Sequence, residues 1–227
     1  MTDHVTKSIV YFDLPGVKNT DKVVEVVRGR VKDGDVKFVV VASITGQTAL
    51  KVGRALRNAK VSVVCVSGPP FWQTFSETDR RVKKHPYINV KTRKLLEKLK
   101  VTIIDNMPSP LGDNVDYGLA RYGFVPASWA VYETLLAVGG YGFKTAVEAI
   151  LLATDCGAIP PFENVISIAG TDKGADTAIV AKSTYSPCMF SKKKEQRFQI
   201  LEILAMPKNK EWYDEITAGE FHAKELS

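Results

Sequence analysis

One segment of the sequence combines the residue types that bind phosphate groups. Residues 39–49 read Val-Val-Val-Ala-Ser-Ile-Thr-Gly-Gln-Thr-Ala, an apolar run that passes through hydroxyl residues and a glycine into a helix expected to begin near Thr48. Such a loop brings free backbone N–H groups, hydroxyls and the positive end of a helix dipole to one point. The segment therefore predicts a phosphate or carboxylate site. The alternative is an ordinary strand–helix turn in which Ser43 or Thr45 only caps the helix.

A second glycine-containing loop follows another apolar run. It reads Gly170-Thr171-Asp172-Lys173-Gly174-Ala175-Asp176. Its two glycines permit positive φ angles and close approach of a ligand to the backbone, and Lys173 could add positive charge. Asp176 could contact the ligand, but an aspartate in a glycine loop often only forms an Asx turn.

Four further polar residues are candidates for the same site. Asn19 and Thr20 begin an expected helix and could offer side-chain donors, or could only cap that helix. Glu148 and Asp155 are the only acidic residues between positions 146 and 158, and their i, i+7 spacing puts them on one helical face. They could bind ligand hydroxyls or a ring edge, or one could act as a general base. Alternatively, Glu148 pairs with a core lysine or a backbone amide, and Asp155 caps a turn.

The elements that must position these residues alternate between strand and helix. We expect strands at 9–12, 38–42, 61–66, 101–104 and 198–206, and a strand–loop–strand unit at 165–181. Helices are expected at about 20–34, 48–58, 91–100 and 127–154, the last interrupted at Gly139-Gly140. This order predicts an α/β three-layer sandwich with a mostly parallel central sheet, formed by one domain over residues 1–227. Ligands of such sheets bind at the carboxyl ends of the strands.

Two regions do not follow the alternation. Residues 71–142 form an irregular insertion, within which 106–123 is expected to be a long loop that lines or covers a site. Residues 208–227 are expected to form a surface helix or tail.

Composition narrows the class of protein. The chain has 227 residues, 45% of them hydrophobic and 25% charged, which is typical of a soluble globular protein. We expect a cytoplasmic protein without a membrane span or signal peptide. Three scattered histidines make a histidine metal site unexpected, and Cys65, inside an apolar run, is expected to be a buried thiol.

The formal net charge of +6 is compatible with an anionic ligand or with nucleic acid. Basic residues concentrate at 80–84 and 192–194. We interpret both as solvated surface, with RNA or ribosome binding as the alternative.

The segment from Ser43 to Ala49 resembles the phosphate-binding loop in the C-terminal α/β domain of pyruvate kinase. The basic residue that usually follows the glycine is replaced here by Gln47. The chain is also similar to stand-alone archaeal proteins of that fold, a group of unassigned function found with flavin mononucleotide (FMN) bound. Matching segments run almost from end to end: 9–12, 15–16, 19–20, 40–49, Glu148, 155–160, 174–178 and 206–210. Residues 71–142 depart most from the group.

The resemblance implies a fold like the pyruvate kinase C-terminal domain and FMN as cofactor. Its binding residues would be Ser43, Ile44, Thr45, Gly46, Gln47, Thr48, Asn19, Thr20, Glu148, Asp155, Gly170, Thr171, Lys173, Gly174, Ala175 and Asp176. Pyruvate kinase activity is not expected, because the barrel domain with its substrate and metal sites is missing. If the protein is an enzyme, it would be a flavin-dependent oxidoreductase. The alternatives are a regulatory domain for another phosphorylated metabolite and an RNA-associated interaction protein, and a homo-oligomer remains open.

Overall fold

A computed structural model describes residues 4–70, 87–112, 114–120 and 122–210. The expected basic cluster at 80–84 and the chain beyond residue 210 lie outside the described residues. In chain order the elements are β1 (Val10–Phe12), η1 (Val17–Asn19), α1 (Thr20–Arg30), η2 (Val31–Asp33), β2 (Phe38–Ala42), α2 (Gln47–Leu56), β3 (Ser62–Val66), α4 (Val90–Lys98), β4 (Thr102–Ile104), α5 (Val115–Ala120), α6 (Ala127–Asp155), β5 (Asn164–Ala169), β6 (Thr177–Lys182), η3 (Ser186–Cys188) and β7 (Gln199–Pro207).

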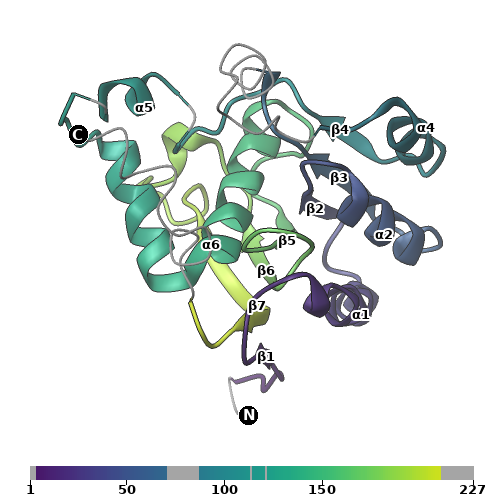
Figure 1. Ribbon diagram of the computed structural model, residues 1–227. Helices are drawn as coiled ribbons and strands as arrows, with labels where there is room; N and C mark the ends of the chain where they lie inside the picture. The colour runs from purple at the N-terminus through teal and green to yellow at the C-terminus, as the bar shows by residue number, and fades with distance from the viewer. Residues whose placement is uncertain (1–3, 71–86, 113, 121, 211–227) are drawn as a thin grey trace.

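The strands form one seven-stranded sheet in the order β1-β7-β6-β5-β2-β3-β4 (Figure 1). Neighbouring strands are parallel except that β6 runs antiparallel to both β5 and β7. The expected strand–loop–strand unit is therefore confirmed as an antiparallel hairpin, with Ala169 opposite Thr177. The fold is α/β with a mixed, mostly parallel sheet packed by helices.

The β-branched run in β2 is buried on both sides because both faces of the sheet are covered. Val39 and Val41 belong to the core that also contains residues of α1 and α2. Val40 belongs to the other core, formed with α6. In Figure 1, α1, α2 and α4 lie on one side of the sheet and α6 lies on the other. Alternation along the strand thus supplies two apolar cores from consecutive residues.

Helix α6 is folded back on itself at the expected glycine pair. Gly140 has φ 78° and ψ 173°, which is not helical, so Ala127–Gly139 and residues 141–155 form two arms. The arms lie side by side (Figure 1), and the Lys144 ammonium stands 4.2 Å from the centre of the Tyr132 ring in the first arm. By length and composition α6 alone, among the described residues, could cross a membrane, but 67% of its most apolar stretch is buried in the fold.

One expectation about the insertion is wrong. Residues 106–123 were expected to form one long loop, but Val115–Ala120 within them form the helix α5. Asn114 begins this short helix by accepting the Asp116 N–H on its side chain at 2.9 Å. A run rich in Pro, Gly, Asp and Asn hides such a single helical turn, since the same residues favour loops and helix starts alike.

The parallel strands direct most of the candidate residues to one edge of the sheet. Strands β1, β2, β5 and β7 run in the same direction, so the segments that follow them leave the sheet at the same edge. The second arm of α6 begins at the same edge, since a Cβ at Gly142 would lie 2.5 Å from Asp176 Oδ1. The expected convergence of the two glycine loops is thus a consequence of the strand directions.

Candidate functional site

The turn between β2 and α2 is tightly fixed. The Ser43 N–H donates to the Val66 carbonyl at 2.8 Å, and the Gly46 N–H donates to the Ser43 carbonyl at 3.0 Å. Gly46 has φ 76°, and a Cβ there would lie 2.9 Å from Thr92 Cγ2. A glycine is required at this position by both the backbone angle and the packing against α4.

Ser43 caps helix α2. Its Oγ accepts hydrogen bonds from the backbone N–H groups of Thr48 at 3.2 Å and Ala49 at 3.3 Å. Ser67 supports the turn by donating its hydroxyl to the Ile44 carbonyl at 2.7 Å. The Ser43 hydroxyl oxygen is therefore occupied by the first turn of α2, as the capping interpretation expects, although Gly46 stands at the N-cap position.

Other donors of the same turn remain open. Among the described residues, neither the backbone N–H groups of Thr45 and Gln47 nor the Thr45 hydroxyl has a hydrogen-bond partner. The Gln47 side chain is occupied, because it donates to Thr92 Oγ1 at 3.1 Å. Thr45 is half-buried, so these donors are positioned by the fold and still reachable. Open N–H groups at a helix N-terminus are the chemistry that receives an anion.

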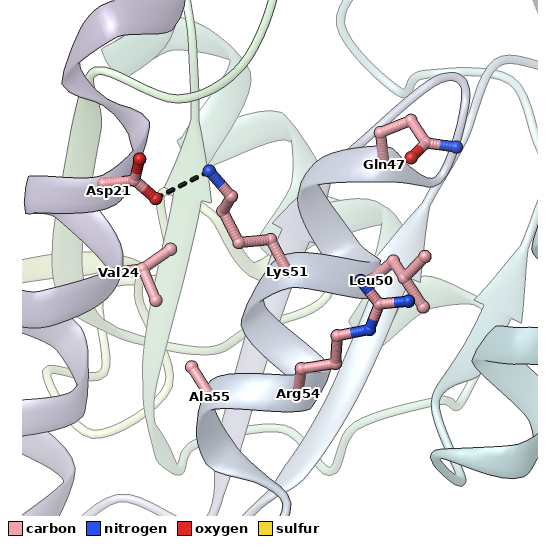
Figure 2. Close-up of a pocket in the computed structure, with 7 residues that line it drawn as sticks. All are labelled: Asp21, Val24, Gln47, Leu50, Lys51, Arg54 and Ala55. Atoms are coloured by element: carbon pink, nitrogen blue, oxygen red, sulfur yellow. Dashed lines mark hydrogen bonds and ion pairs between the residues drawn. The ribbon is translucent and has the colours of Figure 1, made fainter.

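A groove of about 530 Å³ begins beside this turn and runs between α1 and α2 (Figure 2). Val24, Leu50 and Ala55 form its apolar part. Its polar lining is Asp21, Gln47, Lys51 and Arg54. This size falls in the range of small-molecule sites.

The second glycine loop is organised around its own carboxylate. Asp176 is fully buried, and its Oδ2 accepts the N–H groups of Gly16 and Thr171, each at 3.0 Å. The Thr177 hydroxyl donates to Oδ1 at 2.9 Å. None of these contacts is an Asx turn, so that alternative is wrong. The carboxylate occupies the position at which the loop could have held an anion.

Thr20 and Gly174 join the start of α1 to this loop. The Thr20 hydroxyl donates to the Val17 carbonyl at 2.7 Å and accepts the Ala175 N–H at 2.9 Å. Gly174 has φ 78°, and a Cβ there would lie 2.3 Å from Thr20 Oγ1. Asn19, also buried, donates to the Leu14 carbonyl at 2.8 Å and makes no capping bond with its side chain. Both side chains are thus engaged within the fold at the predicted edge.

The remaining members of the second loop differ in exposure. Gly170 is closely packed, since a Cβ there would lie 2.6 Å from the Gly174 carbonyl oxygen. Ala175 is buried, whereas Lys173 is exposed. Of the candidate residues in this loop, only Lys173 is fully open to solvent.

Glu148 is paired with a buried lysine, which is one of the alternatives to ligand binding that the sequence predicts. Its Oε2 lies 2.7 Å from Lys144 Nζ, and both side chains are buried. Its Oε1 accepts the Ser109 hydroxyl at 2.5 Å. The cluster joins the loop after β4 to the second arm of α6, and every oxygen of the carboxylate has a donor.

Asp155 lies apart from the other candidates. It is exposed at the end of α6, where its carboxylate accepts the Ser186 N–H at 2.8 Å and also the Ser186 hydroxyl. This end of α6 precedes β5, so it stands at the amino ends of the parallel strands. The i, i+7 spacing put Glu148 and Asp155 on one helical face, but the length of the helix separates their environments.

Several charged residues near this edge of the sheet were not predicted, because no sequence motif contains them. Lys51 donates to Asp21 at 2.6 Å across the groove. Lys144 pairs with Glu148, and the i, i+4 spacing of these two residues is the sequence pattern that could have indicated this pair. Burial lowers the pKa of Lys210, partly offset by the nearby Asp176 carboxylate. Only the spacing of Lys144 offered a signal in advance.

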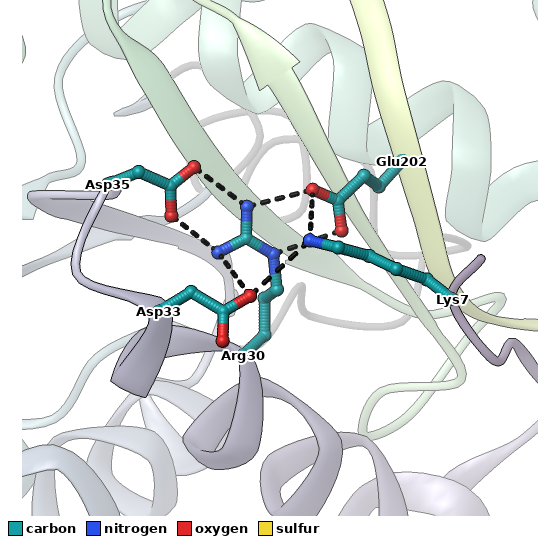
Figure 3. Close-up of polar contacts among 5 residues, drawn as sticks. All are labelled: Lys7, Arg30, Asp33, Asp35 and Glu202. Carbon is teal, nitrogen blue, oxygen red and sulfur yellow. Dashed lines mark hydrogen bonds and ion pairs between the residues drawn. The ribbon is translucent and has the colours of Figure 1, made fainter. Parts of the chain in front are cut away.

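Among the described residues, an ion-pair network around Arg30 lies apart from the candidate site. Arg30 binds Asp35 at 2.6 and 2.9 Å and Glu202 at 2.9 and 2.8 Å, and Lys7 also reaches Glu202 at 3.0 Å (Figure 3). The guanidinium of Arg30 lowers the pKa of both carboxylates. These residues join the C-terminal end of α1 to β7, whereas the open donors follow the carboxyl end of β2, so we assign the network to stability.

No protein-family model matches the sequence.

Among the described residues no group of three or more His, Cys, Asp or Glu side chains is arranged to hold a metal ion. Burial raises the pKa of the Cys65 thiol to about 12, so this cysteine is not a nucleophile at neutral pH. The candidate site is therefore defined by the open donors of the β2–α2 turn and the groove beside them.

Proposed function

We propose that the protein binds a phosphorylated small molecule, FMN, at the carboxyl ends of the parallel strands. The phosphate lies on the backbone N–H groups of Thr45 and Gln47 and on the Thr45 hydroxyl. The observation that carries this proposal is that these donors lack partners among the described residues, while the Ser43 hydroxyl and the N–H groups of Gly46 and Thr48 are occupied within the turn. The N-terminus of α2 adds the favourable end of its dipole.

The second loop limits where the phosphate can lie. The buried Asp176 carboxylate would repel a phosphate placed among the Gly16 and Thr171 N–H groups, and it already uses both donors. This favours the first loop as the anion site. Lys173 is the residue of the second loop that remains able to approach a ligand from outside.

FMN is proposed as the phosphate ester because of the resemblance to the FMN-containing proteins of the pyruvate kinase C-terminal domain fold. Asn19, Thr20, Glu148 and Asp176 then serve to hold the segments around the site, since each has its partners within the protein. If the protein catalyses a reaction, the flavin supplies the redox chemistry and the protein positions it.

A titration that compares FMN with riboflavin tests the proposal, because the two differ only in the phosphate. Flavin fluorescence is followed as protein is added. We expect FMN to bind much more tightly than riboflavin. Thr45→Val removes one hydroxyl at constant shape, and we expect it to weaken FMN binding by about tenfold or more, the usual effect of one hydrogen bond to a charged group.

Thr102→Val is the matched control, since Thr102 is exposed at the start of β4 and is not among the candidate residues. We expect it to leave FMN affinity unchanged. Equal affinities for FMN and riboflavin, or equal effects of the two variants, would contradict the proposed phosphate site. Tighter binding of another phosphate ester would keep the site and replace the ligand.

A further inference from the structure

The groove between α1 and α2 is amphiphilic along its length. Its base is formed by buried Val24 and Leu50, which are 8% and 5% exposed. One end is at Gln47, the first residue of α2, and Arg54 lies two turns further along the same helix. Figure 2 shows Gln47 at the start of α2 and Arg54 further along it, with Leu50 on the turn between them.

The two cations of the groove are not equivalent. Lys51 is neutralised by Asp21, at 2.6 Å across the groove. Arg54 is exposed and, among the described residues, forms no hydrogen bond or ion pair. Arg54 is thus the uncompensated charge of the cavity. Its planar guanidinium offers five donors and a flat face, which suits carbonyl oxygens of a ring or a second acid group.

The spacing sets the length of the ligand. Positions 47 and 54 are seven residues apart in the sequence, which corresponds to roughly 10 Å along a helix. A phosphate held at the Thr45 and Gln47 N–H groups would leave the rest of its ester facing the groove.

We infer that this groove receives the non-phosphate part of the ligand, and that Arg54 selects phosphate esters whose far end carries hydrogen-bond acceptors. The inference rests on the proposed function, because it takes the phosphate position from it. Apolar carbons of the ligand lie over Val24 and Leu50, and the acceptor groups of the head lie at Arg54. Short phosphate esters without such a head gain nothing from Arg54.

Calorimetric titration with FMN and with glycerol 3-phosphate, which has the phosphate but no ring, tests this inference. We expect Arg54→Gln to weaken FMN about tenfold, as expected for loss of a charge-assisted hydrogen bond, and to leave glycerol 3-phosphate within about twofold. Arg54→Lys keeps the charge without the planar fork and is expected to fall between wild type and Arg54→Gln.

Arg57→Gln is the matched control, because Arg57 is exposed immediately after α2 and does not line the groove. We expect it to change neither affinity. Equal weakening of both ligands by Arg54→Gln, or no change in either, would overturn the role of Arg54 while leaving the phosphate site intact. A wild-type protein that binds neither ligand would overturn the proposed function, and this inference with it.

Discussion

The buried carboxylate of Asp176 accepts the backbone N–H of Gly16 at 3.0 Å, although the two residues are 160 positions apart in the chain. Gly16 belongs to the turn after β1, and Asp176 precedes β6. The same carboxylate binds Thr171 and Thr177 and lies against Gly142 at the start of the second arm of α6. One side chain thus fixes the carboxyl edge of the sheet on which the candidate site is built.

Replacement of Asp176 by Ala is expected to reduce the free energy of unfolding by about 3 kcal/mol or more. The substitution leaves the part-buried N–H groups of Gly16 and Thr171 without an acceptor. Asp172→Ala, in the exposed part of the same loop, is the control and should change stability by no more than about 0.5 kcal/mol. Urea denaturation measures both. Similar losses in the two variants would show that Asp176 does not hold these segments.

Gly174→Ala and Gly157→Ala separate packing from backbone strain. Both glycines have positive φ, 78° and 76°, but a Cβ at Gly174 would lie 2.3 Å from Thr20 Oγ1, whereas nothing lies within 4 Å at Gly157. We expect Gly157→Ala to cost about 1 kcal/mol, from the backbone alone, and Gly174→Ala at least about 2 kcal/mol more. Thermal unfolding of the two proteins checks this order. Equal melting temperatures would contradict it.

The Arg30 network predicts how stability depends on pH. Arg30 lowers the pKa of Asp35 and Glu202 below their ordinary values of 3.8 and 4.5. Groups with a depressed pKa in the folded state stabilise it above their ordinary pKa, and this stabilisation is lost as the pH falls through the folded-state pKa. The wild-type urea midpoint is therefore expected to fall steeply below about pH 5.

Arg30→Met should lower stability at pH 7 by about 2 kcal/mol and flatten this acid dependence, because it removes the partner that both carboxylates share. Arg28→Met, on the exposed side of the same helix, is the control. Urea midpoints at neutral and acid pH are compared for the three proteins. An unchanged slope in Arg30→Met would mean that other carboxylates determine the acid sensitivity.

The hydroxyl of Ser167 is fully buried in β5 and has no hydrogen-bond partner among the described residues. Burial of an unpaired hydroxyl costs free energy, and its removal leaves only a small space. Ser167→Ala is expected to leave stability unchanged or to raise it by about 1 kcal/mol, measured by urea denaturation. A loss of more than about 1 kcal/mol would show that the hydroxyl has a partner in solution.

Apart from the short helix α5, the order of strands and helices could be predicted because it depends on local patterns. Buried β-branched runs indicated β2 and β3, and the glycine pair indicated the interruption of α6, though not that the two arms fold back on each other. For Glu148 the sequence left ligand contact, a catalytic role and pairing with a lysine or a backbone amide open, and the structure pairs it with Lys144.

Relations between distant residues could not be predicted. The role of Asp176 depends on Gly16 and Gly142, which only the folded topology brings to it. The separation of Asp155 from the site required the direction of α6 relative to the sheet. The difference between the occupied Ser43 hydroxyl and the open Thr45 donors likewise depends on the geometry of one turn, not on its composition.

The central claim is that the N–H groups of Thr45 and Gln47 hold a phosphate, and amide NMR of the isotopically labelled protein titrated with FMN tests it most directly. We predict that these two amide signals move strongly on binding, with the Thr171 amide, already bonded to Asp176, moving much less. Riboflavin should not reproduce the shifts at Thr45 and Gln47. Saturable shifts confined to other residues, or no shifts at all, would contradict the account.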